Sequence, residues 1–141
     1  MVALDGSKSS QRALDETAHI AKCSNARVHI VFVADAAALS SYPARYRSEV
    51  FGHARRMLDD AQAHLHAAGT ECETQLLETQ SHADPVARCL QRCAVERSAD
   101  LVVMGTHGRA GFRRLVLGSV AEAFLRNSTC PVLMIRSRPQ A

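Results

Sequence analysis

The sequence is poor in aromatic side chains and contains no tryptophan. Two tyrosines and four phenylalanines make up 4% of its 141 residues. Proteins that bind single-stranded nucleic acids stack the bases on aromatic side chains, and this composition offers no such platform. The formal net charge of +3 is also well below the clustered excess of a dedicated nucleic-acid-binding protein. We therefore expect no nucleic-acid partner.

Lysine is scarce as well. Of the 17 basic residues, only Lys8 and Lys22 are lysines, and all the others are arginines. Arginine offers a planar fork of donors that suits phosphate groups. A genome rich in Arg and Ala codons would produce the same excess. The position of each arginine, rather than the total, must decide between these two interpretations.

Long hydrophobic runs are absent from the sequence. No apolar stretch approaches the roughly 18 residues that a membrane span needs. Residues 1–6 lack the basic stretch and the apolar core of a signal peptide. We expect a soluble, cytoplasmic protein with no membrane insertion.

The five cysteines form no pattern typical of a disulfide framework or a zinc site. Their number is odd, no secretory signal accompanies them, and the sequence has no CxxC or HxxxH motif. Cys89 and Cys93 lie four residues apart in an expected helix, where they share one face. We interpret them as small buried thiols rather than as a metal site or a redox pair.

The chain contains enough apolar material for one domain over residues 1–141. Apolar residues make up 47% and charged residues 22%, as in ordinary globular domains. Apolar periodicity alternates between strand and helix along the chain. Strands are expected over 1–4, 28–34, 72–78, 101–104 and 131–135. Helices are expected over 7–25, 50–68 and 119–127, and a further helix is expected to begin at 85. Residues 35–44 are rich in Ala and Ser and contain Pro43, which predicts a loop.

This alternation predicts an α/β fold with a mostly parallel sheet and helices on both faces. Ser7 or Ser9 is expected to cap the first helix, and Gly69 to end the second. Asp84 is expected to cap the third helix, with Pro85 at its first position. In such sheets, ligands bind beyond the carboxyl ends of the strands, where the strand order reverses. The loops after residues 4, 33 and 104 are therefore the candidate positions of a ligand site.

The loop from Gly105 to Ser119 carries the strongest chemical signal. Glycines at 105, 108, 111 and 118 permit sharp turns and expose backbone N–H groups to an anion. The loop starts at a buried strand and finishes at a helix N-terminus, where free N–H groups and the helix dipole favour negative charge. Arg109, Arg113 and Arg114 add positive charge. Together, these features favour a phosphate-bearing ligand.

Several of these residues also have purely structural interpretations. Ser119 and Glu122 fit a capping box that only satisfies the helix, and His107 is either structural or a ligand contact. Asp5 ends the first strand, where it would either reach a ribose hydroxyl or magnesium ion or form an Asx-type turn. Other motifs are missing: the sequence has no Walker A motif, no GxGxxG and no nucleophile elbow.

Three stretches of the sequence match one known pattern. The first is Gly105-x-x-Gly108, nine further residues, and then Gly118-Ser119. The second is the strand and turn from 3 to 7, and the third is the closing strand from 130 to 136. Together they resemble the universal stress protein family in its ATP-binding form, and the similarity spans the whole chain.

The resemblance implies a Rossmann-like, five-stranded parallel sheet in the order 3-2-1-4-5, with ATP at the switch between the first and fourth strands. It also implies a set of nucleotide contacts by matching position. These are Ala3, Leu4 and Asp5 at the adenine end, Val33 through its backbone, Met104 and Gly105 near the ribose, and Gly108, Arg109, Gly118, Ser119 and Val120 at the phosphates, where Mg²⁺ could assist. His107 joins this set as a candidate ligand contact because it follows the end of the fourth strand.

The resemblance further implies a homodimer through Val132–Ile135, which would cover an apolar edge strand. The implied function is that of a homodimeric, ATP-binding regulatory or stress-response protein that other proteins recognise. A slow Mg²⁺-dependent ATPase, with His107 as candidate base, and a nucleotide-free interaction module are the alternatives. Two departures stand out. The first strand is several residues shorter than the family's, and Ala3 stands where some ATP-binding members have proline.

Overall fold

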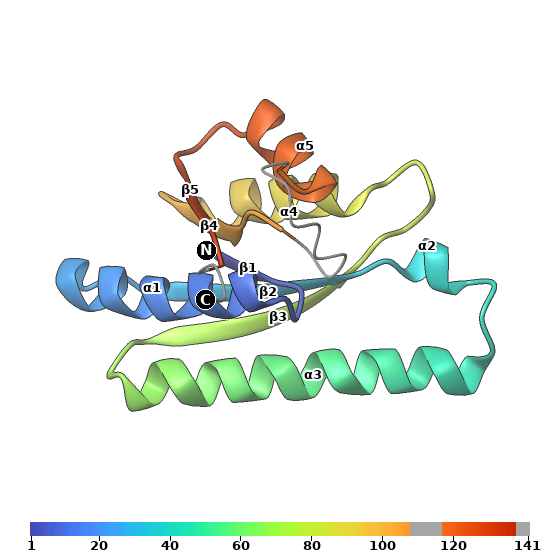
Figure 1. Cartoon of the computed structure of the whole chain (residues 1–141), viewed down its shortest axis with the longest axis horizontal. Coiled ribbons are helices and arrows are strands. Elements are labelled where there is room, and N and C mark those ends of the chain that lie inside the picture. Colours follow the sequence, from blue (N-terminus) through green and yellow to red (C-terminus); the bar gives the residue numbers. More distant parts are fainter. Residues whose placement is uncertain (108–116, 138–141) are drawn as a thin grey trace.

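The computed structural model describes residues 1–107 and 117–137. Within these ranges the chain forms a five-stranded parallel sheet in the order β3-β2-β1-β4-β5, as expected (Figure 1). The strands are β1 (Val2–Leu4), β2 (Val28–Ala34), β3 (Cys72–Glu78), β4 (Val102–Gly105) and β5 (Val132–Ile135). The helices are α1 (Lys8–Ser24), α2 (Ala36–Leu39), α3 (Ala44–Ala67), α4 (Val86–Glu96) and α5 (Ser119–Asn127).

Strand β1 lies at the centre of the sheet, and the chain leaves it in two directions. Strands β2 and β3 lie on one side of β1, and the chain then crosses over so that β4 and β5 lie on the other side. In the register of β1, Leu4 pairs with Phe32 of β2, and Ala3 pairs with Met104 of β4. Helices α1 and α3 cover one face of the sheet, and α4 and α5 cover the other (Figure 1).

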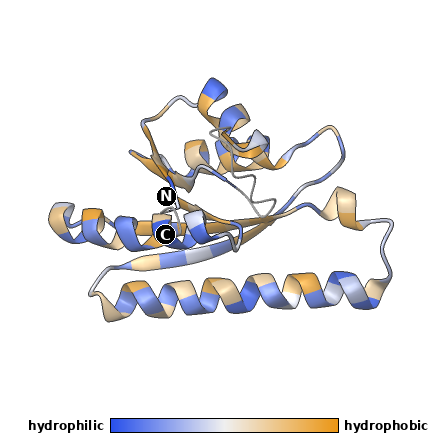
Figure 2. Ribbon diagram, viewed as in Figure 1, coloured by the Kyte–Doolittle hydropathy of each residue, from blue (hydrophilic) through white to orange (hydrophobic). Residues whose placement is uncertain are grey.

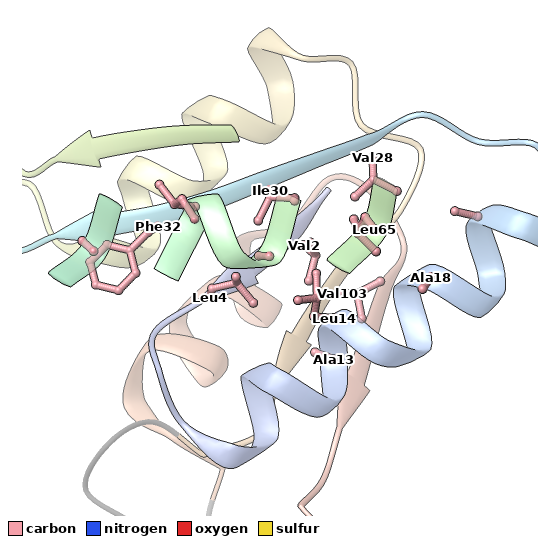
Figure 3. Packing of buried hydrophobic residues seen from close by; sticks show 14 of the residues in the cluster. Val2, Leu4, Ala13, Leu14, Ala18, Val28, Ile30, Phe32, Leu65 and Val103 are labelled. Atoms are coloured by element: carbon pink, nitrogen blue, oxygen red, sulfur yellow. The ribbon is translucent and has the colours of Figure 1, made fainter. Parts of the chain in front are cut away.

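Each face of the sheet has its own hydrophobic core, because successive strand residues point to opposite sides. Val2 and Leu4 pack toward α1 and α3, together with Leu14 and Leu65 (Figure 3). Ala3 points the other way, into the cluster built with α4 and α5. The interior strand β2 is mostly hydrophobic, whereas β3 at the edge and the helices mix hydrophobic and hydrophilic residues (Figure 2). No helix in the described ranges is both long and apolar enough to cross a membrane.

Several predicted boundaries are confirmed. Ser7 caps α1, and its Oγ accepts from the N–H of Ser10 at 3.1 Å. Gly69 follows the end of α3 with a φ of +76°, the left-handed conformation that suits glycine. Cys89 and Cys93 are buried on the inner face of α4, as interpreted from their spacing.

Three boundary predictions are wrong. The segment 35–44 is not all loop, since Asp35 caps the short helix α2 and α3 begins at Ala44. Asp84 does not cap α4, because Pro85 is the N-cap residue and Asp84 binds other groups. The capping box at α5 does not form. Gly118 is the N-cap there, and the carboxylate of Glu122 pairs with Arg126 at 2.8 Å instead.

The end of β4 lies directly against the first turn of α1. A Cβ added to Gly105 would overlap the Oγ of Ser9 and lie 2.8 Å from the N–H nitrogen of Ser10. That Oγ donates a hydrogen bond to the carbonyl of His107 at 2.6 Å. Glycine is therefore required at position 105 because α1 lies so close to it. Its backbone conformation is not the reason, since its φ is not positive.

We expect Gly105→Ala to destabilise the protein by about 1–3 kcal/mol, because the methyl group has no space beside α1. The matched control is Gly52→Ala within α3, where a Cβ would meet only Arg56 Nη1 at 3.5 Å. This control should raise stability by about 0.5–1 kcal/mol, since glycine is a poor residue inside a helix. Thermal unfolding followed by circular dichroism checks both. A Gly105→Ala variant as stable as the parent would contradict the close approach.

Candidate functional site

The candidate site lies at the carboxyl edge of the sheet, where all five parallel strands end. Helix α1 follows β1 onto one face of the sheet, and α5 contacts the core of the other face through Ala121 and Phe124. Because β1 and β4 are neighbours whose connections diverge in this way, a crevice is expected between their carboxyl ends. Three segments therefore meet there: the turn after β1, the end of β4, and the N-terminus of α5.

The turn after β1 is built from its own side chains. The Oδ1 of Asp5 accepts from the N–H of Ser7 at 2.9 Å, and Gly6 has a φ of +83°. This is the Asx-type turn that was one of the two interpretations of Asp5. It directs the chain from β1 into α1, so the first residues of α1 face the end of β4.

The two ends of the glycine loop are joined by the backbone of Thr106. Its carbonyl accepts from the N–H of Gly118 at 2.7 Å, and its N–H donates to the carbonyl of Ile135 at 2.9 Å. The Oγ1 of Thr106 also lies 2.7 Å from Nδ1 of His107. The other ring nitrogen of His107 is buried and has no partner among the described residues. A ligand in the crevice could supply that partner.

The N-terminus of α5 is suited to an anion. Gly118 is the N-cap residue and provides no side-chain hydrogen bond to the first turn. The N–H groups at the start of a helix have no partner within it, and the helix dipole places partial positive charge there. Ser119 and Val120 are exposed at this end. The first turn can therefore donate to a phosphate group.

A cavity of about 290 Å³ opens beside this helix end. It lies between the residue that follows β2, the loop after β3, and the first turns of α4 and α5. Its lining includes Asp35, Ser81, His82, Asp84, Pro85, Ser119 and Val120. The volume is near the lower end of the roughly 300–1,000 Å³ of small-molecule pockets.

Two polar contacts hold the loop after β3 in place. Thr79 Oγ1 donates to Asp35 Oδ1 at 3.0 Å and accepts from the N–H of Ala37 at 3.2 Å. This contact ties the loop to the N-terminus of α2, beside the end of β2. The Thr79 side chain is buried, so the contact is shielded from water.

The second contact is an ion pair between Asp84 and Arg92. The guanidinium donates to both carboxylate oxygens, at 2.5 and 3.0 Å, and the Sγ of Cys89 lies 3.3 Å from Oδ2. The Arg92 hydrogen bonds hold the pKa of Asp84 well below its usual range, and Asp84 raises the pKa of Arg92. Burial raises the pKa of the Cys89 thiol, which therefore stays protonated at neutral pH. Asp84 thus supports the cavity wall as a fixed anion.

Comparison with known proteins identifies the family. The universal stress protein family matches residues 1–136. The universal stress protein YxiE of Bacillus subtilis is 30% identical over 148 aligned positions, covering 96% of this chain and 97% of that protein. A crystal structure from the same family in Burkholderia pseudomallei is 38% identical, covers 95% of this chain and 93% of its own, and has a TM-score of 0.75. The chain belongs to the universal stress protein family.

One further relative carries a bound nucleotide. A universal stress protein solved in complex with cAMP is 28% identical, covers 97% of this chain and 94% of its own, and has a TM-score of 0.70. The family therefore includes nucleotide-binding proteins with this fold.

The structure distributes the sequence-derived site residues over three places. Ala3 and Met104 are paired and buried within the sheet, while the side chain of Leu4 lies in the core under α1 and α3. Val33 is half-buried near the end of β2. Asp5, Gly105 and His107 lie at the carboxyl edge, and Gly118, Ser119 and Val120 at the N-terminus of α5. Gly108 and Arg109 lie outside the described residues.

Four cavity residues escaped the sequence analysis as ligand-site candidates: Asp35, Ser81, His82 and Asp84. The last three lie between β3 and α4, and all four follow a strand end at the same edge as the glycine loop. The rule that ligands bind beyond strand ends applies to the loop after β3 as much as to the loops after 4, 33 and 104. The same rule, applied to the loop after every strand, identifies these four residues as candidates.

We expect the ion pair of Asp84 to contribute to stability above acidic pH. Because its pKa is lowered in the folded protein, its contribution is present above about pH 4, the ordinary range of Asp, and is lost as the pH falls further. Asp84→Asn should therefore lower stability at pH 7 and flatten its fall between about pH 5 and pH 2. Denaturation with urea at several pH values measures this.

Asp59→Asn, a substitution of an exposed residue on α3, is the matched control for the pH series. It should keep both the stability at pH 7 and the acid dependence of the parent. Arg92→Gln should reproduce the flattening by removing the partner. If Asp84→Asn kept the full acid dependence of the parent, the ion pair would not be its source.

Proposed function

We propose that this chain binds ATP at the carboxyl edge of the sheet and acts as a homodimeric regulatory or stress-response protein. The observation that carries the proposal is the N-terminus of α5, which lacks a side-chain cap and is tied to the end of β4 by the bond from Gly118 to Thr106. The family membership and the cAMP complex of a relative support an adenine nucleotide as the ligand.

The residues present fit such a ligand. Gly105 packs so closely on α1 that only glycine is accommodated at the edge of the crevice. The ring nitrogen Nε2 of His107 is buried and has no partner among the described residues, and a hydrogen-bonding group of a nucleotide would satisfy it. Ser119 and Val120 offer their N–H groups to phosphate oxygens, and Gly108 and Arg109 are the further phosphate contacts that the family resemblance implies. Bound Mg²⁺ would neutralise part of the triphosphate charge.

The adenine end follows from the same resemblance. Ala3, Asp5 and Val33 lie at or near the ends of two neighbouring strands, β1 and β2, where their backbone groups can meet the base. Leu4 takes part only through its backbone, because its side chain packs on the other face of the sheet. Met104 and Gly105 end the adjacent strand β4 and lie on the ribose side of this arrangement.

We expect nucleotide-free protein to bind ATP, and Gly118→Val to weaken binding at least tenfold. The branched side chain would obstruct the first turn of α5, where the phosphates bind. Gly52→Val is the matched control on α3 and should bind like the parent. Isothermal titration calorimetry with ATP, AMP and cAMP measures the affinities and ranks the nucleotides. Equal ATP affinity of the Gly118→Val variant and the parent would refute this site.

The homodimer is proposed from the open edge of β5. Its four apolar residues, Val132–Ile135, are all partly exposed in the single chain. The carbonyls of Pro131 and Ile135 accept from the N–H groups of Val102 in β4 and of Thr106 just after it. The backbone N–H and C=O groups of odd-numbered residues in β5 therefore point to β4, and those of even-numbered residues point to the open edge. An apolar strand with free backbone groups readily pairs with another chain. A second copy of β5 would satisfy the N–H groups of Val132 and Met134.

We expect Met134→Pro to convert the dimer into a monomer, because proline removes an N–H that points to the open edge. Met134→Leu keeps both the N–H and an apolar side chain, so it should remain dimeric. Sedimentation velocity of all three proteins reports their mass in solution, and circular dichroism confirms that each is folded. A folded Met134→Pro protein that sediments as a dimer would exclude β5 as the interface.

A further inference from the structure

A second cavity, of about 560 Å³, lies on the face of the sheet that α1 and α3 cover. We call it the α1–α3 groove, since the facing sides of the two helices form its walls. It is bounded by Leu4, Gly6 and Leu14 on one side and by Arg56, Asp60 and Ala61 on the other. Its volume lies well within the roughly 300–1,000 Å³ of small-molecule sites. It belongs to the opposite face of the sheet from the cavity beside α5.

The floor of the α1–α3 groove is apolar. Leu4 and Leu14, which point toward each other from β1 and α1 (Figure 3), line it together with Ala61, and all three are at most 4% exposed. The half-buried Met57 belongs to the same lining. These four side chains come from three elements: Leu4 from β1, Leu14 from α1, and Met57 and Ala61 from α3. Because Leu14 is fully buried and Leu4 and Ala61 are at most 4% exposed, an apolar group here would contact mainly Met57, and the apolar surface removed from water there is favourable.

The ends of the α1–α3 groove are defined by contacts between its walls. Near the start of α1, Gly6 adopts a φ of +83°, and a Cβ added there would lie 2.9 Å from Cε of Met57. Farther along both helices, Nε2 of His64 lies 3.1 Å from Oδ1 of Asp15, which joins α3 to α1. Gly6 and His64 both belong to the groove lining, so both contacts lie at its margin.

Two opposite charges line the α3 wall without pairing with each other. Arg56 and Asp60 are four residues apart on one face of the helix, and both are exposed. Neither has an ion pair or hydrogen bond to another residue in the described parts of the chain. A helix pair at this spacing commonly forms a salt bridge. Here the guanidinium of Arg56 lies beside Gly52, one turn earlier on α3, and it and the carboxylate of Asp60 are each available to a ligand at the groove.

We propose that the α1–α3 groove binds a small zwitterion with an apolar side chain, the chemistry of an apolar or aromatic amino acid. The ligand carboxylate pairs with the guanidinium of Arg56, and its ammonium group with the carboxylate of Asp60. Its apolar side chain lies on the floor against Met57 and the edges of Leu4 and Ala61. The net charge of Arg56 and Asp60 together is zero, which favours a ligand with both charges over one with a single charge.

This site is independent of the proposed nucleotide site. The two share only the segment from β1 into α1: Leu4 and Gly6 line the groove, while Ser9 faces the end of β4 through its bond to His107. A ligand in the groove needs neither ATP nor the N-terminus of α5. A failure of ATP binding would therefore leave this proposal standing, and the reverse also holds.

Three probes of one shape test the ligand class. L-phenylalanine carries both charges, 3-phenylpropionate lacks the amine, and 2-phenylethylamine lacks the carboxylate. In ¹H–¹⁵N correlation spectra of the full chain without ATP, we expect phenylalanine to shift the amides of Gly6, Leu14 and Ala61. Each of the other two compounds should bind at least tenfold more weakly. If no probe shifts these amides at millimolar concentration, or if phenylpropionate binds as well as phenylalanine, the proposal is overturned.

The chain offers matched controls one residue away on the same helix. Arg56→Gln and Asp60→Asn should each weaken phenylalanine binding about tenfold, because each removes one charge partner. Arg55→Gln and Asp59→Asn change the same residue types on α3 outside the groove lining, and they should bind like the parent. Equal effects of the two pairs would show that general charge, rather than the groove, is responsible. Gly118→Val should leave phenylalanine binding unchanged.

Discussion

The structure depends on the position of β1 between β2 and β4. This strand has only three residues, yet it pairs with a neighbour on each side and supplies side chains to both cores. Because the chain builds outward from β1 in both directions, the connections after β1 and β4 diverge at one edge. The candidate nucleotide site, the two helical layers and the α1–α3 groove all follow from this arrangement.

The close packing of the end of β4 on the first turn of α1 fixes the geometry of the candidate site at the carboxyl edge of the sheet. Gly105 allows the end of β4 to contact the first turn of α1, and Ser9 then binds the carbonyl of His107. Thr106 joins the start of the glycine loop to its finish at Gly118 and also bonds to β5. The N-terminal end of α5, which we propose as the phosphate-binding position, is thus held by backbone hydrogen bonds. On the other side of the cavity, buried polar contacts of Thr79 and Asp84 fix the wall.

Structural features that depend on neighbouring residues were predicted better than contacts between residues far apart in the sequence. The strand and helix alternation, the cap at Ser7 and the buried thiols of Cys89 and Cys93 follow from nearest-neighbour preferences and helix periodicity, so the sequence predicted them correctly. The cap at Asp84 was predicted wrongly because a carboxylate before Pro85 suits a helix start. Its partner Arg92 lies two turns along the helix and competes for the same oxygens more strongly than a backbone N–H.

Sequence periodicity alone determined the fold class, and the resemblance carried by the glycine spacing, the first strand and turn, and the closing strand gave the family and with it the order of the strands. Tertiary structure decided which polar residues meet. Asp35 and Thr79 are 44 positions apart, and Asp15 reaches His64 from another helix. The width of the α1–α3 groove depends on how far α1 and α3 stand apart on the sheet. That separation is set by packing on the sheet, which no local pattern specifies.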